Sequence, residues 1–440
     1  MRLNLKIATA ACALLLCTTL SAQQRWSLEM CIKHAQEHNL QIQQQQVTVE
    51  QAKNNLLAAK TEYAPSVNAS MNHNMSWGRS VNLNDLEIIE NQRSQSTSLN
   101  ISASLPIFEG LKKQNTVKSN TKQLEIAGTN VEKLKDDISL SVAQGYLQAL
   151  LAQEIEKTAQ ESYNSIKEQV DRCRILVDAG SQPYSSLLEL EAQLAAEKVQ
   201  VVSAANNVRS TLLTLAQLLN IEDIANFNIE QPQVEHLTLV PEDVQIEDIY
   251  IDAQELPRIK GAELSLEQSK LQYKIQKGSA LPTLSVSAGY GTYYSDNQPT
   301  PFFEQFNNNR NPSLGFGLSI PIFNNLKTNS SIKNARLSIR QSELELEITR
   351  QNLLKEIQQA ANDVQASYEK MNAAQQNMAS AKESFRYTQE KFNAGAASGT
   401  DYTIAKTNLF KAESEYLQNK YQYILQQKVL DYYRNIPLTL

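Results

Sequence analysis

Four short segments of the chain alternate between apolar and polar residues at every second position. In residues 66–77 the odd positions are mostly apolar, whereas every even position is Ser or Asn. Residues 96–106, 283–293 and 313–321 show the same alternation, with Ser, Asn or Gly at most of the polar positions. A period of two predicts β-strands that present two different faces. Each strand is about ten residues long, which is the length that crosses a bilayer when the strand is tilted.

The polar faces of these predicted strands carry no charge. A sheet that faces water usually exposes Lys and Glu, but none of the four segments contains Asp, Glu, Lys or Arg. The pattern therefore favours four membrane strands, and a soluble pair of hairpins with an uncharged outer face is the alternative. Residues 78–95 and 295–312 are expected to be hairpin loops. Aromatic residues near the strand ends suit the girdle of a membrane-spanning sheet: Trp77, Tyr290, Tyr293, Tyr294, Phe302 and Phe303.

The remainder of the chain reads as long helices. Residues 322–394 contain neither Gly nor Pro, the two residues that are least favourable inside a helix. A seam of residues recurs every seven positions in this segment and predicts coiled-coil packing: Ile332, Ile339, Leu346, Leu353, Ala360, Ser367 and Ala374. We expect helices at residues 27–63, 107–179, 184–219, 257–280, 322–394 and 399–434.

The chain also repeats itself. Pro106 and Phe108, in the sequence Leu-Pro-Ile-Phe, recur 215 positions later as Pro321 and Phe323, in Ile-Pro-Ile-Phe. The same offset relates two other segments, Val-Asp-Ala-Gly and Phe-Asn-Ala-Gly. These matches predict two copies of one unit, each with a helix, two strands, a very long helix and a returning helix. The predicted divisions are a first repeat at residues 23–220, a joining segment at 221–256 and a second repeat at 257–440.

Both long helices are predicted to end at a glycine. Gly180 and Gly395 stand just past the last helical residue, where a left-handed conformation is wanted. In the first copy, Pro183 follows the glycine and precedes the returning helix. In the second copy, Thr400 or Asp401 is expected to cap the returning helix. Each copy therefore carries a helix-turn-helix tip.

Residues 1–22 have the pattern of a secretory signal peptide. Two basic residues precede an apolar core, and small residues follow it. Cys17 raises the possibility of a lipid anchor, but the preceding Leu16 stands where the lipid-attachment motif wants Gly or Ala. The exported chain keeps Cys31 and Cys173, which we expect to be two separate buried thiols, with a disulfide as the alternative.

Composition and motifs exclude several classes of protein. No segment after residue 22 approaches the roughly 18–20 apolar residues of a membrane-spanning helix, so a polytopic helical membrane protein is excluded. The formal net charge of −6 disfavours a nucleic-acid binder. His34-Ala-Gln-Glu-His38 matches a string found in some zinc peptidases, but no further acidic ligand motif follows it. We expect no enzyme activity, no cofactor and no metal site.

Four membrane strands in one chain require partners. An open sheet has two edges, and each unpaired backbone group in hydrocarbon costs several kcal/mol. The edges must therefore pair with other copies of the chain. Two chains would supply eight strands, whose barrel is filled by its own side chains, and three would supply twelve strands and a lumen. Strand pairing alone does not choose between three and four copies.

The order of these elements resembles the TolC family of outer-membrane efflux ducts. The resemblance covers nearly all of residues 26–437, and its most specific parts are the doubled Pro-Ile-Phe and the Gly-capped turns. It implies an α+β membrane protein: a homotrimer with a twelve-stranded transmembrane β-barrel in outer-membrane lipid and a twelve-helix α-barrel in the periplasm. Residues 221–256 would form an equatorial band. The helix-turn-helix tips would dock onto a periplasmic adaptor protein and an inner-membrane pump.

The resemblance also implies site residues at the tips. Alignment on Gly395 places Asp401 on a family aspartate that rings the periplasmic gate, and the alternative is that Asp401 only caps a helix. Ile404 and Ala397 stand where the family has a second acidic residue and a basic residue. The corresponding acidic position in the first copy is Ser186, with Glu189 nearby. Residues expected to shape the adaptor-docking tips are Gly180, Pro183, Gly395 and Gly399.

The function implied is transport without any bond made or broken. The chain is expected to be the exit duct of a tripartite efflux system, which passes small molecules across the periplasm and the outer membrane. A duct for type I protein secretion or metal export is an alternative in the same class. A structural periplasmic coiled coil is an alternative from a different class. The sequence does not identify the substrate.

Overall fold

The computed structural model describes residues 25–81, 88–232 and 245–440. The predicted signal peptide lies outside the described residues. The chain forms two compact units, and each unit takes segments from both halves of the sequence. One unit, here called the helical unit, comprises the residues up to Gln45, Val131–Pro257 and Arg350–Leu440; the other, the sheet unit, comprises Gln46–Asn130 and Arg258–Thr349.

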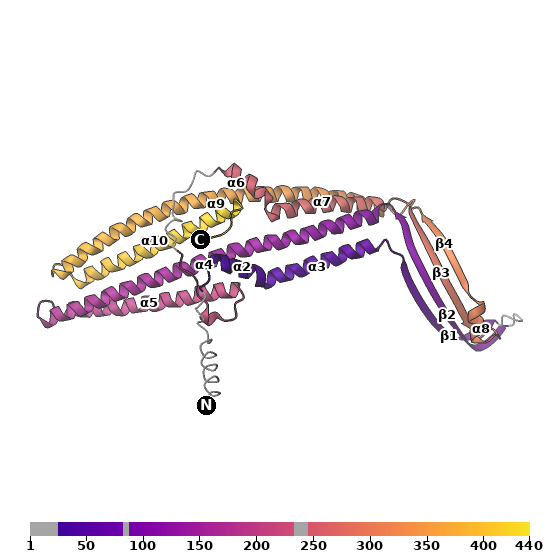
Figure 1. Cartoon of the computed structure of the whole chain (residues 1–440), viewed down its shortest axis with the longest axis horizontal. Coiled ribbons are helices and arrows are strands. Elements are labelled where there is room, and N and C mark those ends of the chain that lie inside the picture. Colours follow the sequence, from indigo (N-terminus) through magenta and orange to yellow (C-terminus); the bar gives the residue numbers. More distant parts are fainter. Residues whose placement is uncertain (1–24, 82–87, 233–244) are drawn as a thin grey trace, which may run out of the picture. The chain divides into compact units, whose positions relative to one another are not determined.

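The sheet unit contains one antiparallel sheet of four strands in the order β1-β2-β3-β4 (Figure 1). The strands are β1 (Ser66–Val81), β2 (Ile88–Glu109), β3 (Thr283–Ser295) and β4 (Asn311–Ser319). The two predicted hairpins are therefore confirmed, and β2 pairs with β3 to join them. Strands β1 and β4 are the two outer edges of the sheet within the described residues.

The register keeps the two kinds of residue on opposite faces across all four strands. Met71 of β1 lies opposite Leu99 of β2, and its neighbour Ser70 lies opposite Asn100. On the other hairpin, Val286 of β3 lies opposite Phe316 of β4. One face of the sheet is therefore apolar and the other carries Ser, Asn and Gly. The apolar face is exposed in this chain, with Phe316 at 73%.

The strand ends differ from the predicted ones. Strands β1 and β2 continue into residues 78–95, which were expected to be a loop, because backbone pairing persists past the first charged residues: Trp77 lies opposite Arg93. Residues 82–87 are outside the described part of the chain. Strand β4 ends at Ser319 rather than 321, because its partner β3 begins at Thr283, opposite Ser319, and nothing pairs beyond it.

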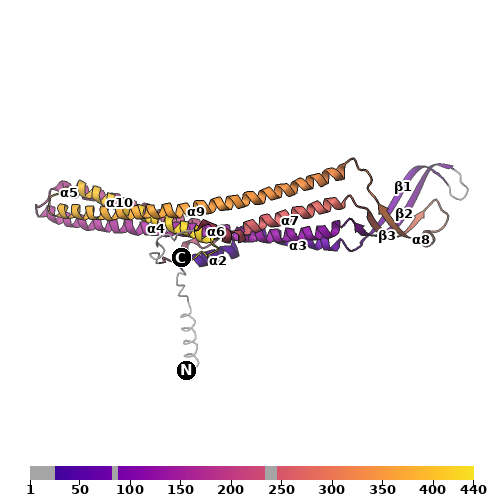
Figure 2. The ribbon, with the colours of Figure 1, turned by 90° about the horizontal axis from the view of Figure 1, so that it is seen from above.

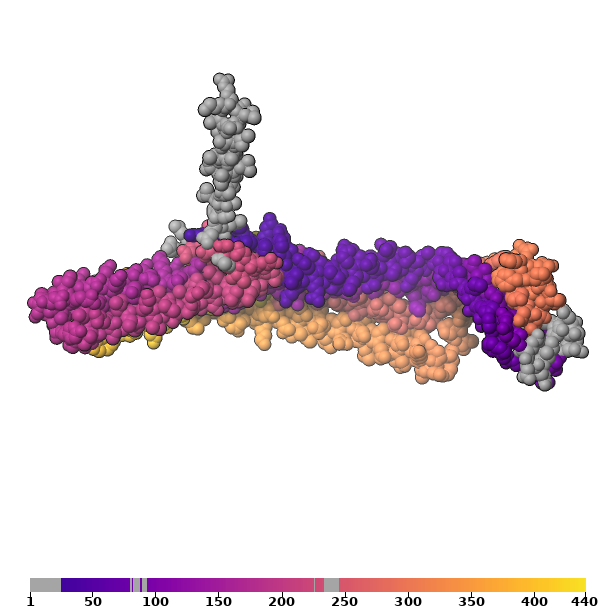
Figure 3. All heavy atoms as spheres, turned by 90° about the horizontal axis from the view of Figure 1, so that it is seen from below, coloured from indigo at the N-terminus to yellow at the C-terminus, as the bar shows by residue number. Residues whose placement is uncertain are grey.

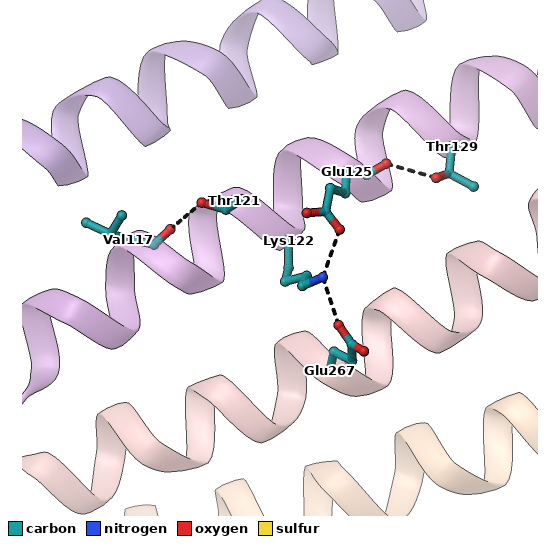
Figure 4. A network of polar contacts seen from close by, with 6 residues as sticks. All are labelled: Val117, Thr121, Lys122, Glu125, Thr129 and Glu267. Atoms are coloured by element: carbon teal, nitrogen blue, oxygen red, sulfur yellow. Dashed lines mark hydrogen bonds and ion pairs between the residues drawn. The ribbon is translucent and has the colours of Figure 1, made fainter.

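Helical segments of the sheet unit lead into or out of the strands. Helix α3 (Leu40–Thr61) precedes β1, and α7 (Pro257–Gly278) precedes β3. The first part of α4 (Lys112–Asp178) follows β2. The Lys122 ammonium on α4 forms ion pairs with Glu125 of the same helix and with Glu267 of α7, both at 2.9 Å (Figure 4). This contact ties α4 to α7.

Two glycines allow the backbone at the end of α7 to approach the backbone between β2 and α4 closely. Gly110 has a φ of +61°, and a Cβ on it would collide with the backbone oxygen of Gly278 at the end of α7. A Cβ on Gly278 would in turn collide with the backbone oxygen of Gly110. Neither position has room for a side chain.

The helical unit begins with α2 (Leu28–His38), which Asn39 separates from α3. A single helix was expected over residues 27–63, so that prediction was wrong at this point. Asn39 is extended, with ψ of 126°, and its Oδ1 accepts a hydrogen bond of 2.8 Å from the backbone N–H of Gln41. Asn is a preferred N-cap residue, and it starts α3 here.

Two helix hairpins make up most of the helical unit. The second part of α4 turns into α5 (Tyr184–Leu218), and the second part of α9 (Lys327–Asn393) turns into α10 (Gly399–Tyr433) (Figures 1 and 2). The segment predicted as the equatorial band holds the short helix α6 (Ile246–Asp252) and two 3-10 turns, Ile224–Asn226 and Ala253–Glu255. Residues 233–244 of that segment are outside the described residues. In the described residues, no helix carries an apolar stretch long enough to cross a membrane.

The core of the helical unit follows the predicted seven-residue seam. Leu353, Ala360, Ser367 and Ala374 of α9 are all buried. The earlier seam residues, Ile332, Ile339 and Leu346, lie in the sheet unit and are only half-buried. The seam therefore packs within this chain at one end of α9 and leaves the other end partly uncovered.

Positive φ angles fall at the same places in the two halves of the chain. Each long helix is preceded by two left-handed residues, Gly110 and Leu111 in one half and Asn325 and Leu326 in the other. Gly180 and Gly395 at the tips, and Asn220 and Asn435 after the returning helices, have positive φ as well. All four pairs are separated by the same offset as the sequence motifs.

Candidate functional site

Both helix-turn-helix tips stop their long helix in the same way. At the first tip, Gly180 has φ of +70°, and its N–H donates to the carbonyl of Val177 at 2.9 Å. At the second tip, Gly395 has φ of +74°, and its N–H donates to the carbonyl of Phe392 at 3.0 Å. The next residue in each tip bonds back to the carbonyl five positions earlier. This is the Schellman arrangement, which favours glycine because a Cβ is disfavoured at positive φ.

The second tip starts its returning helix with a capping box. The N-cap residue is Ser398, not Thr400 or Asp401 as predicted. The backbone N–H of Asp401 donates to Ser398 Oγ at 3.1 Å, while the Asp401 carboxylate accepts from the N–H and the hydroxyl of Ser398 at 3.1 and 2.8 Å. These hydrogen bonds hold the pKa of Asp401 below its usual value, the side-chain bond to Ser398 contributing most. Asp401 is exposed.

The first tip supplies a second carboxylate to the same helix start. Glu189 of α5 lies against Gly399, the first residue of α10, so closely that a Cβ on Gly399 would collide with the carboxylate. Negative charge is favoured at a helix N-terminus, where backbone N–H groups are unpaired. The structure therefore brings Glu189 and Asp401 to the N-terminus of α10. Ser186 is half-buried on α5, and Pro183 precedes α5 without any side-chain cap.

The two hairpins share one core beneath the tips. Phe385 and Phe392 of α9 lie 5.3 and 5.2 Å, between ring centroids, from the fully buried Tyr402 of α10. The first hairpin contributes aliphatic residues to the same cluster, among them Val170 and Leu187. The first hairpin has a continuous surface in the space-filling view (magenta, Figure 3). This core fixes the position of the helix starts that carry the gate candidates.

Polar contacts also cross between the hairpins. Gln169 of α4 donates to the side chain of Asn393 at 3.2 Å, and Gln182 donates to the carbonyl of Phe392 at 3.5 Å. Both contacts reach the C-terminal end of α9, where backbone carbonyls need partners.

A buried lysine lies deeper in the same cluster and was missed at the sequence level. Lys406 of α10 is 8% exposed, and its Nζ lies 5.0 Å from the centre of the Phe385 ring. Burial lowers the pKa of Lys406, and nearby carboxylates of Glu413, Glu197 and Glu161 oppose this shift. Tyr402, Lys406 and Leu409 follow helical i, i+4, i+7 spacing, so the spacing could have indicated that Lys406 faces the core.

The two Pro-Ile-Phe motifs lie in different local structures. Pro106 and Phe108 are inside β2, with a bulge between them, whereas Pro321 and Phe323 follow β4 and are not in a strand. The first residues of β3 pair with β2 as far as Glu109, whereas β4 has its last partner at Ser319, opposite Thr283, so the strand continues through the first motif alone. Lys113 binds the carbonyl of Pro106 at 3.2 Å and that of Glu62 at 2.5 Å.

The two cysteines are separate, free and buried, as expected. Burial raises the pKa of Cys31 to about 12 and also raises the pKa of Cys173, which disfavours the thiolate form of both side chains. The imidazole rings of His34 and His38 stack with centroids 4.2 Å apart. Among the described residues, no three His, Cys, Asp or Glu side chains are placed to hold a metal ion.

Comparison with known proteins gives the family. The sequence profile described as outer membrane efflux protein matches residues 31–220 and 252–432, which is most of the chain. This chain belongs to the outer membrane efflux protein family. The resemblance drawn from the sequence is confirmed, and with it the assignment of the chain to efflux and to the outer membrane.

Individual relatives and a solved structure agree with this family. The chain is 19% identical over 357 residues to the outer membrane efflux protein BepC of Brucella suis, covering 81% of this chain and 74% of BepC. It is 21% identical over 351 residues to the outer membrane protein TolC of Escherichia coli, covering 76% and 68%. The structure of CusC, reported with transmembrane channel formation, superposes with a TM-score of 0.78 at 17% identity and covers 93% of this chain and 92% of CusC.

Proposed function

We propose that three copies of this chain form the exit duct of a tripartite efflux system. The observation that carries the proposal is the four-stranded sheet, which has an exposed apolar face and, within the described part of the chain, two unpaired edges, β1 and β4. In a membrane these edges must be paired. Three chains supply twelve strands, enough for a barrel with a lumen. The Ser, Asn and Gly face would line that lumen and the apolar face would contact lipid.

The helices beside the two sheet edges support contacts between copies. Exposed apolar residues lie on α3, which precedes edge strand β1, and on α9, which follows edge strand β4. Both helices would thus continue the subunit contact that begins at the strand edges and extend the barrel as a coiled coil. The exposed apolar residues concerned are Val47 and Leu57 on α3, and Leu337, Leu344 and Ile348 on α9.

A repeated architecture is part of the proposal. The sequence motifs and the positive φ angles share one offset along the chain, which supports two structural repeats at residues 23–220 and 257–440. Residues 221–256 would form the equatorial band between them. The tips would dock onto a periplasmic adaptor that connects the duct to an inner-membrane pump, with Gly180, Pro183, Gly395 and Gly399 shaping the docking surface.

Native mass spectrometry of the protein extracted in mild detergent tests the assembly. We expect a mass of three chains and ion conductance after reconstitution into a planar bilayer. A single-chain mass without conductance would refute the duct and leave the structural coiled coil as the alternative.

Deletion of the gene tests the substrate class. We expect the deletion strain to become more sensitive to antibiotics and dyes, and expression from a plasmid to restore tolerance. Unchanged tolerance with loss of one secreted protein, or with accumulation of a metal, would replace small-molecule efflux with one of the alternative duct functions.

Asp401 is proposed to line the closed end of the duct. Three carboxylates around an axis attract cations and raise one another's pKa, which opposes the lowering that Ser398 causes within one chain. We expect a trivalent cation to block the conductance of the natural protein, and Asp401→Asn to weaken this block about tenfold or more. The matched control is Glu191→Gln, which removes a carboxylate from an exposed ion pair of the first hairpin; equal block in the natural protein and in Asp401→Asn would remove Asp401 from the gate.

A further inference from the structure

The loop between β3 and β4 contains a short helix that packs on the apolar face of the sheet. Helix α8 (Phe302–Asn308) follows β3, and Thr292 of β3 donates through Oγ1 to the carbonyl of Phe306 at 2.6 Å. Thr292 and Tyr294 alternate in step with Val286 and therefore share the apolar face. The ring of Tyr294 lies 4.8 Å from that of Phe302. Phe302 lies near the end of β3, as expected, but on a helix that the sequence did not indicate.

Helix α8 is held firmly in this position. Gln305 is 1% exposed, and its Oε1 accepts a 3.0 Å hydrogen bond from the backbone N–H of Ser295 at the end of β3. Its Nε2 donates to the carbonyls of Ser295 and Thr300 at 3.0 and 2.6 Å. Asn309 adds a bond of 2.9 Å to the carbonyl of Tyr293. The buried amide thus joins the helix to the strand and to the preceding loop.

This fixed helix presents aromatic rings outward. Phe302 contacts both Phe306 and Phe303, with centroids 4.6 and 5.4 Å apart. Phe303 is 85% exposed, although a large aromatic side chain on a well-anchored helix normally packs against something. Glu304, Asn307 and Asn308 are the remaining exposed residues of α8. Aromatic rings beside polar residues are typical of the lipid–water boundary.

The length of β3 places α8 at that boundary. The strand has 13 residues, which at a rise of about 3.3 Å and a tilt of about 45° spans roughly 30 Å of membrane thickness. Helix α7 precedes the strand and α8 follows it, so the two helices lie at opposite ends of the strand. If α7 is periplasmic, α8 lies at the outer leaflet.

We propose that α8 is an interfacial anchor, in which Phe303 inserts into the outer-leaflet lipid just below the headgroups. The partner is the lipid surface, because the rings continue the apolar sheet face that the proposed function places against lipid, and this inference rests on that function. The anchor would fix the height of the duct in the outer membrane. A second copy of the chain covering Phe303 is the competing occupant.

Single-tryptophan fluorescence in liposomes tests the anchor. Trp26 and Trp77 are replaced by Phe, and Phe303→Trp is compared with Phe316→Trp on β4 and Tyr184→Trp at the first tip. All three sites are exposed, at 85%, 73% and 62%, so each has room for the larger indole ring. The probes are phosphatidylcholine brominated near the glycerol end of its chains, the same lipid brominated near the chain ends, and aqueous iodide.

We expect lipid brominated near the glycerol to remove about half of the fluorescence of Phe303→Trp, and lipid brominated at the chain ends to remove less. Quenching of Phe303→Trp by iodide and not by bromine would overturn the anchor, because the ring would then face water. Quenching by neither would also overturn it, because the ring would then be covered by protein. Phe316→Trp separates the two proposals: if bromine fails to quench it, the membrane sheet itself is wrong.

Discussion

The two helix-turn-helix tips end their long helices alike and begin their returning helices differently. Gly180 and Gly395 end their helices with the same hydrogen bonds and the same positive φ. They are separated by the same offset as the repeated sequence motifs. Pro183, in the first tip, offers no side-chain cap, whereas Ser398, at the corresponding place in the second, forms a capping box with Asp401. The glycine common to both tips sets the turn. The residue at the N-cap position, Pro183 or Ser398, decides which returning helix begins with a fixed, negatively charged side chain.

The two hairpins also contribute different side chains to the core that they share behind the tips. Leu187 of the first hairpin corresponds to Tyr402 of the second, and Val177 corresponds to Phe392. The second hairpin therefore contributes the aromatic part of the shared core. A large ring buries more area than an aliphatic side chain. The second tip is thus the more firmly anchored of the two, which agrees with the gate that we propose there.

The largest effect is expected from removing the aromatic anchor. Tyr402→Ala should cost about 4 kcal/mol of folding stability, and Leu187→Ala about 3 kcal/mol, since each leaves a cavity. Thermal unfolding followed by circular dichroism measures the loss, and amide hydrogen exchange at residues 384–410 locates it. Tyr402→Phe is the control and should stay within about 1 kcal/mol. A smaller loss for Tyr402→Ala than for Leu187→Ala would reverse the comparison.

The next effect concerns the caps. Ser398→Ala should cost about 1 kcal/mol, because it removes the acceptor for the Asp401 N–H. Pro183→Ala removes no side-chain cap and should change stability by much less. Faster amide exchange in the first turn of α10, with no comparable change in α5, is the expected result. If Ser398→Ala accelerated amide exchange equally at the starts of α5 and α10, the capping box would not be what stabilises the start of α10.

A smaller effect on the stability of the start of α10 is expected when the pH is lowered. The pKa of Asp401 is held low by Ser398, so its contribution to stability is present above the unfolded pKa of about 3.9 and is lost as pH falls through the folded pKa. Exchange at the start of α10 should therefore accelerate below about pH 4 in the natural protein. Asp401→Asn should remove this pH dependence while leaving the first tip unchanged. A persistent acid transition at α10 would assign it to another carboxyl group.

The smallest effect is expected at the surface of the first hairpin. Arg174 pairs with Glu191 at 2.9 Å, and both side chains are largely exposed; such pairs contribute about 0–1 kcal/mol. Glu191→Ala should lower the unfolding temperature slightly at low salt and not at all at high salt. The corresponding residue of the second hairpin is the buried Lys406. A salt-independent loss above about 1 kcal/mol would mean that the pair is not a surface contact in the assembled protein.

Local sequence patterns predicted the element types and their order well. Alternation of apolar and polar residues located all four strands, and the glycines at 180 and 395 located both tips. The element ends were less accurate, as at Ser319 and Asn39, because they depend on whether a neighbouring strand or a capping side chain is present. The N-cap was misplaced by a few residues for the same reason.

The arrangement around the candidate gate could not be predicted from the sequence. Glu189 was singled out only because it lies near Ser186 in the chain, and its place against Gly399 depends on how two hairpins from different halves of the chain pack together. The position of α8 on the apolar sheet face depends likewise on Gln305 meeting the end of β3. Nothing in the spacing of Phe302 and Phe303 shows that they belong to a helix.

The sequence by itself determined what each segment becomes, because strand alternation, helix periodicity and glycine turns act between residues a few positions apart. It also determined that one face of the sheet is apolar and that the chain holds the same motifs twice. Only the tertiary structure decided which side chains meet: the carboxylates at the start of α10, the aromatic core of the second tip and the amide that holds α8. Such contacts join distant parts of the chain, and their geometry follows from packing rather than from local conformational preference.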